Sequence, residues 1–224
     1  MSNPIYCALD TTDLDRARDL GRRVAPYVGG LKLGLEFFMA HGPAGVRAIG
    51  ALGLPVFLDV KLHDIPNTVA GAMRALAPLG LAVVNVHAPG GGAMMRAARD
   101  AMPPATRVVA VTVLTSLDDA DLMSAGVADG AAAQVGRLAV LARNAGLDGI
   151  VCSAREVAAM RAQWTDGYFV VPGIRPAGSD VGDQKRVMTP REALGAGASM
   201  LVIGRPITGA EDPAIAARAI AESL

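Results

Sequence analysis

The chain has 224 residues, and its 21 lysines and arginines are balanced by 21 aspartates and glutamates. Apolar residues make up 52% of the chain, which is enough for a large core and excludes a disordered protein. The zero net charge removes any general attraction to nucleic acid or to an anionic membrane, so we expect neither as a partner.

The cysteines and the apolar segments predict a soluble protein of the cytoplasm. Cys7 and Cys152 lie far apart inside apolar runs, which indicates buried thiols and neither a disulfide framework nor a metal site. No basic segment followed by an apolar stretch suggests a secretory signal. The uncharged span Ala75–Met95 contains Pro78 and Pro89, which favour a loop, a strand and a second loop over a membrane helix.

Short β-branched runs bounded by turn residues predict eight strands. They are Ile5–Asp10, Gly30–Leu35, Val56–Lys61, Leu81–His87, Val108–Thr115, Gly149–Ser153, Tyr168–Ile174 and Met200–Gly204. Segments with helical spacing alternate with them, for example Glu36–Ala51, Pro66–Leu79 and Pro213–Leu224. This alternation predicts an α/β protein, a (β/α)₈ TIM barrel in which residues 1–224 form a single domain. An open doubly wound sheet is the alternative, but its Gly-x-Gly-x-x-Gly turn is absent after the first strand.

Several polar residues have spacings typical of helix caps. Thr12 with Asp15 predicts a capping box at the start of the first helix, and Gly146 predicts the end of another helix. Ser116 is as suited to a helix N-cap as to a ligand contact. Asp10, at the end of the first strand, either caps the following helix or binds a substrate hydroxyl.

The third predicted strand ends in charged residues. Asp59 and Lys61 point to the same face because strand side chains alternate, and Val60 points to the other. Asp64 lies just beyond, in a turn. Burying these charges for structure alone is costly, and barrel active sites lie at this end of the strands, so we predict a catalytic cluster. The alternative is a strand-end salt bridge, with Asp64 capping the helix whose first turn contains Pro66.

Lys32 adds a second ammonium to this cluster. It lies inside an apolar strand, and a closed barrel has no edge where a lysine could reach solvent. With Asp59, Lys61 and Asp64 it makes an array of two ammoniums and two carboxylates. Such an array can press a carboxylate against a substrate anion while a lysine stays protonated as a general acid.

The last two predicted strands end in Gly–Arg turns, at Gly173 to Arg175 and at Gly204 and Arg205. Loops at these two strands form the usual phosphate site of the barrel, which favours a phosphate site here over ordinary turns. The polar stretch 176–189 predicts a lid, and Gln184 within it is suited to a ligand's polar edge. Thr115, at the end of the fifth strand, has a hydroxyl suited to a heterocycle. The pattern indicates a barrel enzyme for a phosphorylated small molecule, with no evident metal site.

Two lone histidines are predicted to be structural. His63 faces away from Asp59 and Lys61, which indicates a structural residue. His87 closes the fourth strand, where a packed histidine is more common than a ligand.

Motifs along nearly the whole chain resemble those of the bacterial orotidine 5′-phosphate decarboxylase family. The most specific is Asp-x-Lys-x-x-Asp followed by Ile-Pro-Asn-Thr, from Asp59 to Thr68. The other motifs are Cys-Ala-Leu-Asp at 7–10, Lys-Leu-Gly at 32–34, Leu-Thr-Ser at 114–116, Val-Pro-Gly-Ile-Arg-Pro at 171–176, Asp-Gln-Lys-Arg at 183–186 and Ile-Gly-Arg-Pro-Ile at 203–207.

The resemblance implies decarboxylation of orotidine 5′-monophosphate to UMP and CO₂, by a homodimer without a metal or organic cofactor. Lys61 resembles the residue that protonates C6 of the pyrimidine, Asp59 and Lys32 complete the array, and Asp64 resembles a residue that reaches the neighbouring subunit's site. The implied substrate-binding residues are Asp10, Lys32, Asp59, Val60, Lys61, Leu62, His63, Asp64, Ile65, Pro66, Asn67, Thr68, Thr115, Arg175, Gln184, Gly204 and Arg205.

Two other functions remain as alternatives. A sugar-phosphate lyase of the same superfamily would use Mg²⁺ to hold an enediolate, and Glu36 is the nearby candidate for its extra acidic ligand. The Ile-Pro-Asn-Thr extension and the Leu-Thr-Ser hydroxyls argue against it. A catalytically silent phosphate-binding barrel is the third interpretation, which the intact Asp59, Lys61 and Asp64 disfavour.

Overall fold

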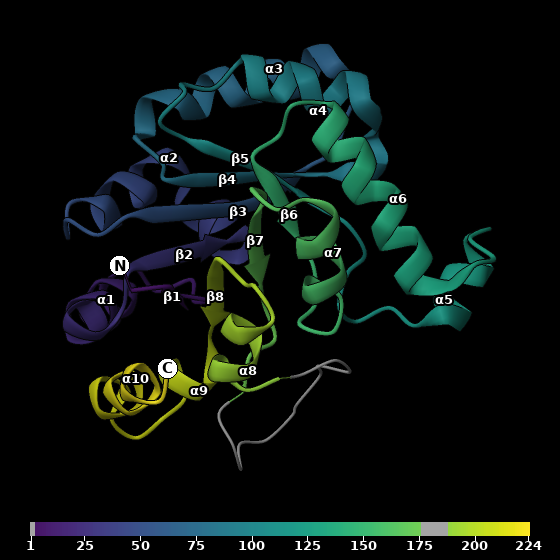
Figure 1. Cartoon of the computed structure of the whole chain (residues 1–224). Coiled ribbons are helices and arrows are strands. Elements are labelled where there is room, and N and C mark those ends of the chain that lie inside the picture. The colour runs from purple at the N-terminus through teal and green to yellow at the C-terminus, as the bar shows by residue number, and fades with distance from the viewer. Residues whose placement is uncertain (1–2, 176–187) are drawn as a thin grey trace.

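The computed structural model describes residues 3–175 and 188–224, and its centre is a closed barrel of parallel strands. The strands pair in chain order and the last pairs with the first, while the helices lie outside them (Figure 1). The strands are β1 Ile5–Ala8, β2 Gly30–Gly34, β3 Val56–Leu62, β4 Val83–His87, β5 Arg107–Val111, β6 Gly149–Val151, β7 Tyr168–Val171 and β8 Met200–Ile203. The predicted (β/α)₈ barrel is confirmed, although several strands are shorter than predicted.

The helices follow the strands in the expected alternation. They are α1 Leu14–Val24, α2 Leu35–Gly50, α3 Pro66–Leu76, α4 Gly91–Asp100, α5 Asp119–Ser124, α6 Gly130–Asn144, α7 Val157–Gln163, α8 Pro190–Gly195, α9 Arg205–Thr208 and α10 Pro213–Glu222, with short 3₁₀ turns at Ala25–Tyr27, Ala77–Leu79 and Ala88–Gly90. Gly146 follows α6 with a φ of 77°, as its predicted role at a helix end requires. Within the described part of the chain, no helix combines the length and apolarity needed to cross a membrane.

The predicted capping box of Thr12 and Asp15 was wrong, and the open alternatives of caps at Asp10, Ser116 and Asp64 are not realised. Helix α1 is capped by Asp13, whose side chain accepts the N–H of Arg16, so neither Thr12 nor Asp10 caps it. Thr12 and Asp13 are adjacent residues that can both cap a helix. The helix begins at Leu14, which makes Asp13 the cap.

Helix α5 begins two residues later than a cap at Ser116 would require, and it is capped by a reciprocal Asp118–Asp121 box. Helix α3 begins after Ile65 without a side-chain cap, so Asp64 does not cap it either.

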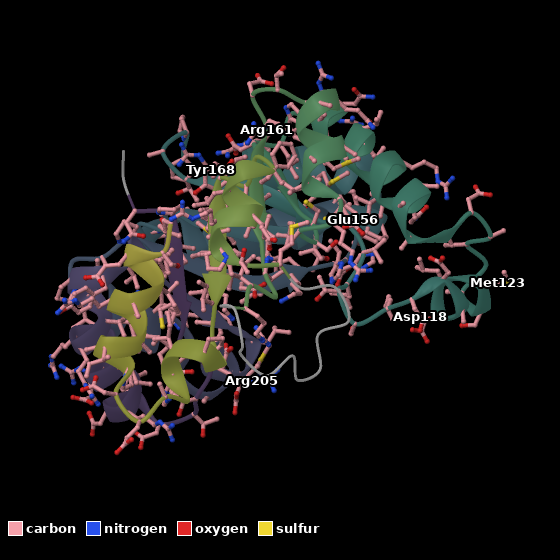
Figure 2. The ribbon with its side chains drawn as sticks, turned by 60° about the horizontal axis from the view of Figure 1, so that its bottom comes forward. Asp118, Met123, Glu156, Arg161, Tyr168 and Arg205 are labelled. Carbon is pink, nitrogen blue, oxygen red and sulfur yellow. The ribbon has the colours of Figure 1, made fainter. Side chains whose placement is uncertain are left out.

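Alternating strand residues fill the barrel in layers. Tyr6, Phe57, Val83, Val109 and Met200 belong to a buried apolar cluster contributed by inward-facing positions. The next inward positions lie two residues further along each strand. On β2, β3 and β4 these positions are polar or charged, and they are Lys32, Asp59 and Asn85. Figure 2 shows Tyr168, which begins β7, and Arg205, which follows β8, at opposite ends of the barrel. The polar layer therefore lies toward the end that carries Arg205.

Two glycine substitutions test the packing of the strands. A Cβ at Gly149, on β6, would lie 1.8 Å from the backbone oxygen of Tyr168, whereas a Cβ at Gly136, inside α6, would meet nothing within 4 Å. We expect Gly149→Ala to lower the free energy of unfolding by about 1–3 kcal/mol, because strand backbone must move. We expect Gly136→Ala to raise it by about 0.5–1 kcal/mol, because alanine favours a helix. Urea unfolding measures both, and equal effects would contradict the prediction.

Candidate active site

A network of ion pairs lies at the carboxyl ends of β1, β2 and β3. Lys32 Nζ is 2.9 Å from Asp10 Oδ1 and 3.6 Å from Asp59 Oδ2. Lys61 Nζ donates to the other oxygen of the same carboxylate, Asp59 Oδ1, at 2.6 Å. Asp59 therefore bridges both lysines, and the predicted grouping of Lys32, Asp59 and Lys61 is present within one chain.

The second carboxylate of this network is Asp10 and not Asp64. Asp10 follows β1, which pairs with β2, and the pairing sets Ala8 beside Lys32. Asp64 is exposed and its Oδ1 accepts the N–H of Ile65 at 2.6 Å, so it turns back on its own loop. Asp64 therefore does not join the Asp59 network within the described chain, since the chain leaves the barrel after Leu62.

Asp59 is held as a carboxylate despite its burial. Burial alone raises the pKa of a carboxyl group, but the ammoniums of Lys32 and Lys61 and the hydrogen bonds from Lys61 and Asn85 outweigh it and lower the Asp59 pKa below 3.8. A carboxylate fixed in this way keeps its negative charge at neutral pH. The site therefore presents positive and negative side chains in alternation, of which Lys32 and Asp59 are largely buried.

A polar pocket of about 490 Å³ opens beside this network. Its walls carry the charges of Lys32, Asp59 and Asp10 on one side and the turns after β7 and β8 on the other. It is lined by Ala8, Asp10, Lys32, Asp59, Pro172, Gly173, Arg175, Val202, Gly204 and Arg205. The structure thus brings both predicted Gly–Arg turns to the same pocket as the lysines.

A second pocket, of about 170 Å³, adjoins the first and is mostly apolar. Both pockets share Asp59, Pro172 and Val202 as lining residues. The second pocket is lined in addition by Phe57, Lys61, Val111, Val113, Leu114, Thr115, Val151, Cys152 and Val170. Except for Lys61 and Thr115, these residues were missed, because inward-facing aliphatic side chains look like ordinary barrel core in the sequence.

Of the predicted substrate-binding residues from Val60 to Thr68, only Lys61 lines one of these pockets. Val60 packs in the core and lines neither pocket, because strand alternation turns it outward. Leu62 is partly buried against the same core. His63, Asp64, Ile65, Pro66, Asn67 and Thr68 are exposed. Gln184 and nearly all of the predicted lid lie outside the described residues.

His87 and His63 form a pair next to the network. Their ring centroids are 5.8 Å apart. Burial lowers the pKa of His87, and the nearby side chains of His63 and Lys61 lower it further, against the opposing effect of Asp59. His87 is therefore neutral at pH 7, and it lines neither pocket.

Asn85 is a polar residue of the site that the sequence motifs do not indicate. The amide of Asn85, on β4, donates to Asp59 Oδ1 at 2.7 Å and accepts the backbone N–H of Lys61 at 2.8 Å. A polar residue at an inward position of an otherwise apolar strand was the available signal. Within residues 3–175 and 188–224, no cluster of three histidine, cysteine or acidic side chains is arranged to hold a metal ion.

A closed barrel with buried ion pairs at the carboxyl ends of its strands, opening into pockets, defines a class of protein. It is that of the (β/α)₈-barrel enzymes, which act on their substrates at this end of the barrel.

Comparisons with known proteins identify the family within this class. Residues 3–220 match the model of the orotidine 5′-phosphate decarboxylase / HUMPS family. The chain is similar to proteins named orotidine 5′-phosphate decarboxylase from Novosphingobium aromaticivorans, at 61% identity, and Sphingopyxis alaskensis, at 57%, over the full length of each chain. The crystal structure of that enzyme from Lactobacillus acidophilus matches with a TM-score of 0.84 at 35% identity, covering 98% of both chains. The chain belongs to the orotidine 5′-phosphate decarboxylase / HUMPS family.

The central role of Asp59 predicts a pH-dependent stability. Asp59→Asn leaves two lysines without their shared counter-charge, so we expect the free energy of unfolding at pH 7 to fall by on the order of 3 kcal/mol. Because the folded state lowers the Asp59 pKa, this contribution is complete above pH 3.8 and is lost as the pH falls through the lowered value. The matched control is Asp10→Asn, which removes a half-exposed partner of Lys32 and costs less than about 1 kcal/mol. Urea unfolding at pH 7, 5 and 3.5 measures both, and a difference that does not shrink at pH 3.5 contradicts the prediction.

Proposed function

We propose that the protein converts orotidine 5′-monophosphate to UMP and CO₂ in pyrimidine biosynthesis, with the network around Asp59 as its active site. One observation carries the assignment of the site. The Asp59–Lys61 pair, with Nζ and Oδ1 2.6 Å apart, lies where the charged pocket meets the apolar one. A nucleotide that spans both pockets therefore has its base beside these two groups.

The two pockets suit the two ends of such a nucleotide. The turns that carry Arg175 and Arg205 offer guanidinium groups and backbone amides for the phosphate. Asp10 and Lys32, between the turns and Asp59, are suited to the ribose hydroxyls. The apolar pocket is of a size for a pyrimidine ring, and the Thr115 hydroxyl supplies a polar contact at its edge.

The reaction breaks the bond between C6 and the carboxylate, and the electron pair stays on C6. Asp59 lies near the substrate carboxylate and repels it, a repulsion that ends when neutral CO₂ departs. Lys61 donates a proton to C6, and the resulting amine regains a proton from solvent. Fixed ammoniums stabilise the developing negative charge without reorganisation. The distant phosphate contributes binding energy to this step. No metal or organic cofactor enters the scheme.

The relatives do not favour the alternative of a Mg²⁺-dependent sugar-phosphate lyase. The full-length matches above are named orotidine 5′-phosphate decarboxylase. Glu36, the candidate for a further metal ligand, is exposed at the start of α2.

We also propose a homodimer in which Asp64 reaches the partner's site. Large apolar side chains are exposed around the ends of β2 and β3, at Leu35, Met39 and Ile65, and Met39 and Ile65 are 75% and 67% exposed. An exposed acidic residue beside apolar side chains is typical of a surface that another chain covers. The free thiols of Cys7 and Cys152 fit a reducing cytoplasm as the place of action.

The role of Lys61 is tested by following the ultraviolet absorbance of orotidine 5′-monophosphate in excess EDTA. We expect the wild-type protein to convert the spectrum to that of UMP. Lys61→Ala lowers turnover by about 10²–10⁴-fold, because it removes the proton donor, while UMP still binds. Arg218→Ala, which removes only an exposed α10 ion pair with Glu222, is the control with normal turnover. Near-normal turnover in Lys61→Ala would contradict the role, and activity restored only by Mg²⁺ would favour the lyase.

The shared site is tested by combining two inactive subunits. A mixed dimer pairs one Lys61→Ala chain with one Asp64→Ala chain. One of its two sites then combines the wild-type Lys61 of the second chain with the wild-type Asp64 of the first. Co-expression in equal amounts is expected to give about a quarter of wild-type activity, because about half of the dimers are mixed and each has one intact site. Each variant expressed alone is the control. No recovery in dimers shown to be mixed would mean that Asp64 acts within its own chain.

A further inference from the structure

Asn85 faces the bulge of β3 that carries the charged pair. The pairing of β3 with β4 joins Leu58 to Val84 and Leu62 to Val86, so residues 59–61 of β3 lie opposite Asn85 alone. The bulge removes the regular ladder of backbone hydrogen bonds at this point. A buried backbone N–H left there without an acceptor would be costly.

The side chain of Asn85 replaces the missing ladder. Its Oδ1 accepts the N–H of Lys61 at 2.8 Å, and Asn85 has no exposed surface. Lys61 has a φ of 49°, the one positive φ among the non-glycine residues that the structure describes. This left-handed backbone costs about 1–2 kcal/mol and persists only where the surroundings enforce it. The bond from Asn85 therefore enforces the backbone that aims Lys61.

The same amide also orients the carboxylate. Asn85 Nδ2 donates to Asp59 Oδ1 at 2.7 Å, and this oxygen also accepts Lys61 Nζ at 2.6 Å. With two donors on Oδ1, the second oxygen is turned toward Lys32, 3.6 Å away. One neutral side chain thus sets the backbone of the proton donor and the rotation of the carboxylate, without adding charge to the site.

We infer that Asn85 is a positioning residue of the decarboxylation, which holds Lys61 and Asp59 in their reactive arrangement through its two amide bonds. The inference rests on the proposed function. It assigns Asn85 no contact with the substrate, since Asn85 lines neither pocket.

The first test is Asn85→Ala, which removes both bonds. We expect kcat to fall about 10- to 100-fold, because a small misplacement of reacting groups has effects of this size. KM and UMP affinity change less than about threefold, because the groups that bind the nucleotide keep their places. Thr106→Val is the matched control, since the Thr106 hydroxyl also makes a buried hydrogen bond between neighbouring segments of the barrel, to Leu81 O, just before β5 and β4 begin and thus at the opposite end from Asp59. It is expected to keep normal kcat.

The second test, Asn85→Asp, has the same shape and separates positioning from packing. At neutral pH the new carboxylate lies beside Asp59. The hydrogen bond that the Asn85 amide donates to Asp59 Oδ1 is then lost, and kcat falls. The like charge raises the shared pKa, and below it one proton lies between the two carboxyl groups, as the amide hydrogen does in the wild type. The other charges near this position are Lys61 and, beyond Asp59, Lys32; His87 lies two residues further on β4, and the inward residues of β5 are apolar. We therefore expect kcat of this variant to rise as the pH falls, relative to wild type.

Urea unfolding of every variant gives the fraction of folded protein under the assay conditions. This measurement separates a loss of positioning from a loss of folded protein. An Asn85→Asp variant whose pH profile parallels the wild type overturns the inference, as does a loss of kcat that only follows the folded fraction. In both cases wild-type turnover leaves the proposed function intact. Absence of turnover in the wild-type protein itself overturns the proposed function.

Discussion

The carboxylate of Asp59 is the one group on which the rest of the site depends. Its side chain is only 15% exposed, and a charge in such a place persists only when its lost hydration is replaced. Lys32, Lys61 and Asn85 supply that replacement from β2, β3 and β4, which are adjacent strands of the barrel. The arrangement is mutual, because each lysine also needs a nearby negative charge. Removing one member leaves the others as uncompensated charges or unsatisfied polar groups.

A closed barrel is well suited to hold such a group. Closure leaves no strand edge through which water could reach the interior, and the apolar layer that includes Tyr6, Phe57 and Val83 supports the polar layer from below. Lys32 lies on a strand paired on both sides, and the bulge of β3 that carries Asp59 and Lys61 is held by the side chain of Asn85, so these charges move little when a substrate enters. Electrostatic catalysis requires this rigidity, since charges that reorganise during the reaction lose much of their effect.

Regular features of the fold and site were predictable, and the irregular ones were not. Strand alternation placed Asp59 and Lys61 on one face and Val60 on the other, and closure explained a lysine within β2. The left-handed backbone of Lys61 arises from a mismatch in length between β3 and β4, which no local pattern encodes. Asn85 acts through that mismatch, so its role was hidden for the same reason. The choice of Asp10 over Asp64 as partner of Lys32 depends on which way a turn leaves the barrel.

The division of the two pockets follows from the same geometry. The polar pocket is bounded by turns that carry Arg175 and Arg205, whereas the apolar pocket is bounded mainly by strand residues such as Val111 and Val170. Turns adjust to a ligand more readily than paired strands do, because fewer hydrogen bonds hold them. Under the proposed function, the phosphate is then held by the adaptable part and the reacting carbon by the rigid part. Binding energy gained at the turns can hold the base close to Asp59. The bulge that carries Asp59 resists displacement because Asn85 of β4 is hydrogen-bonded to it.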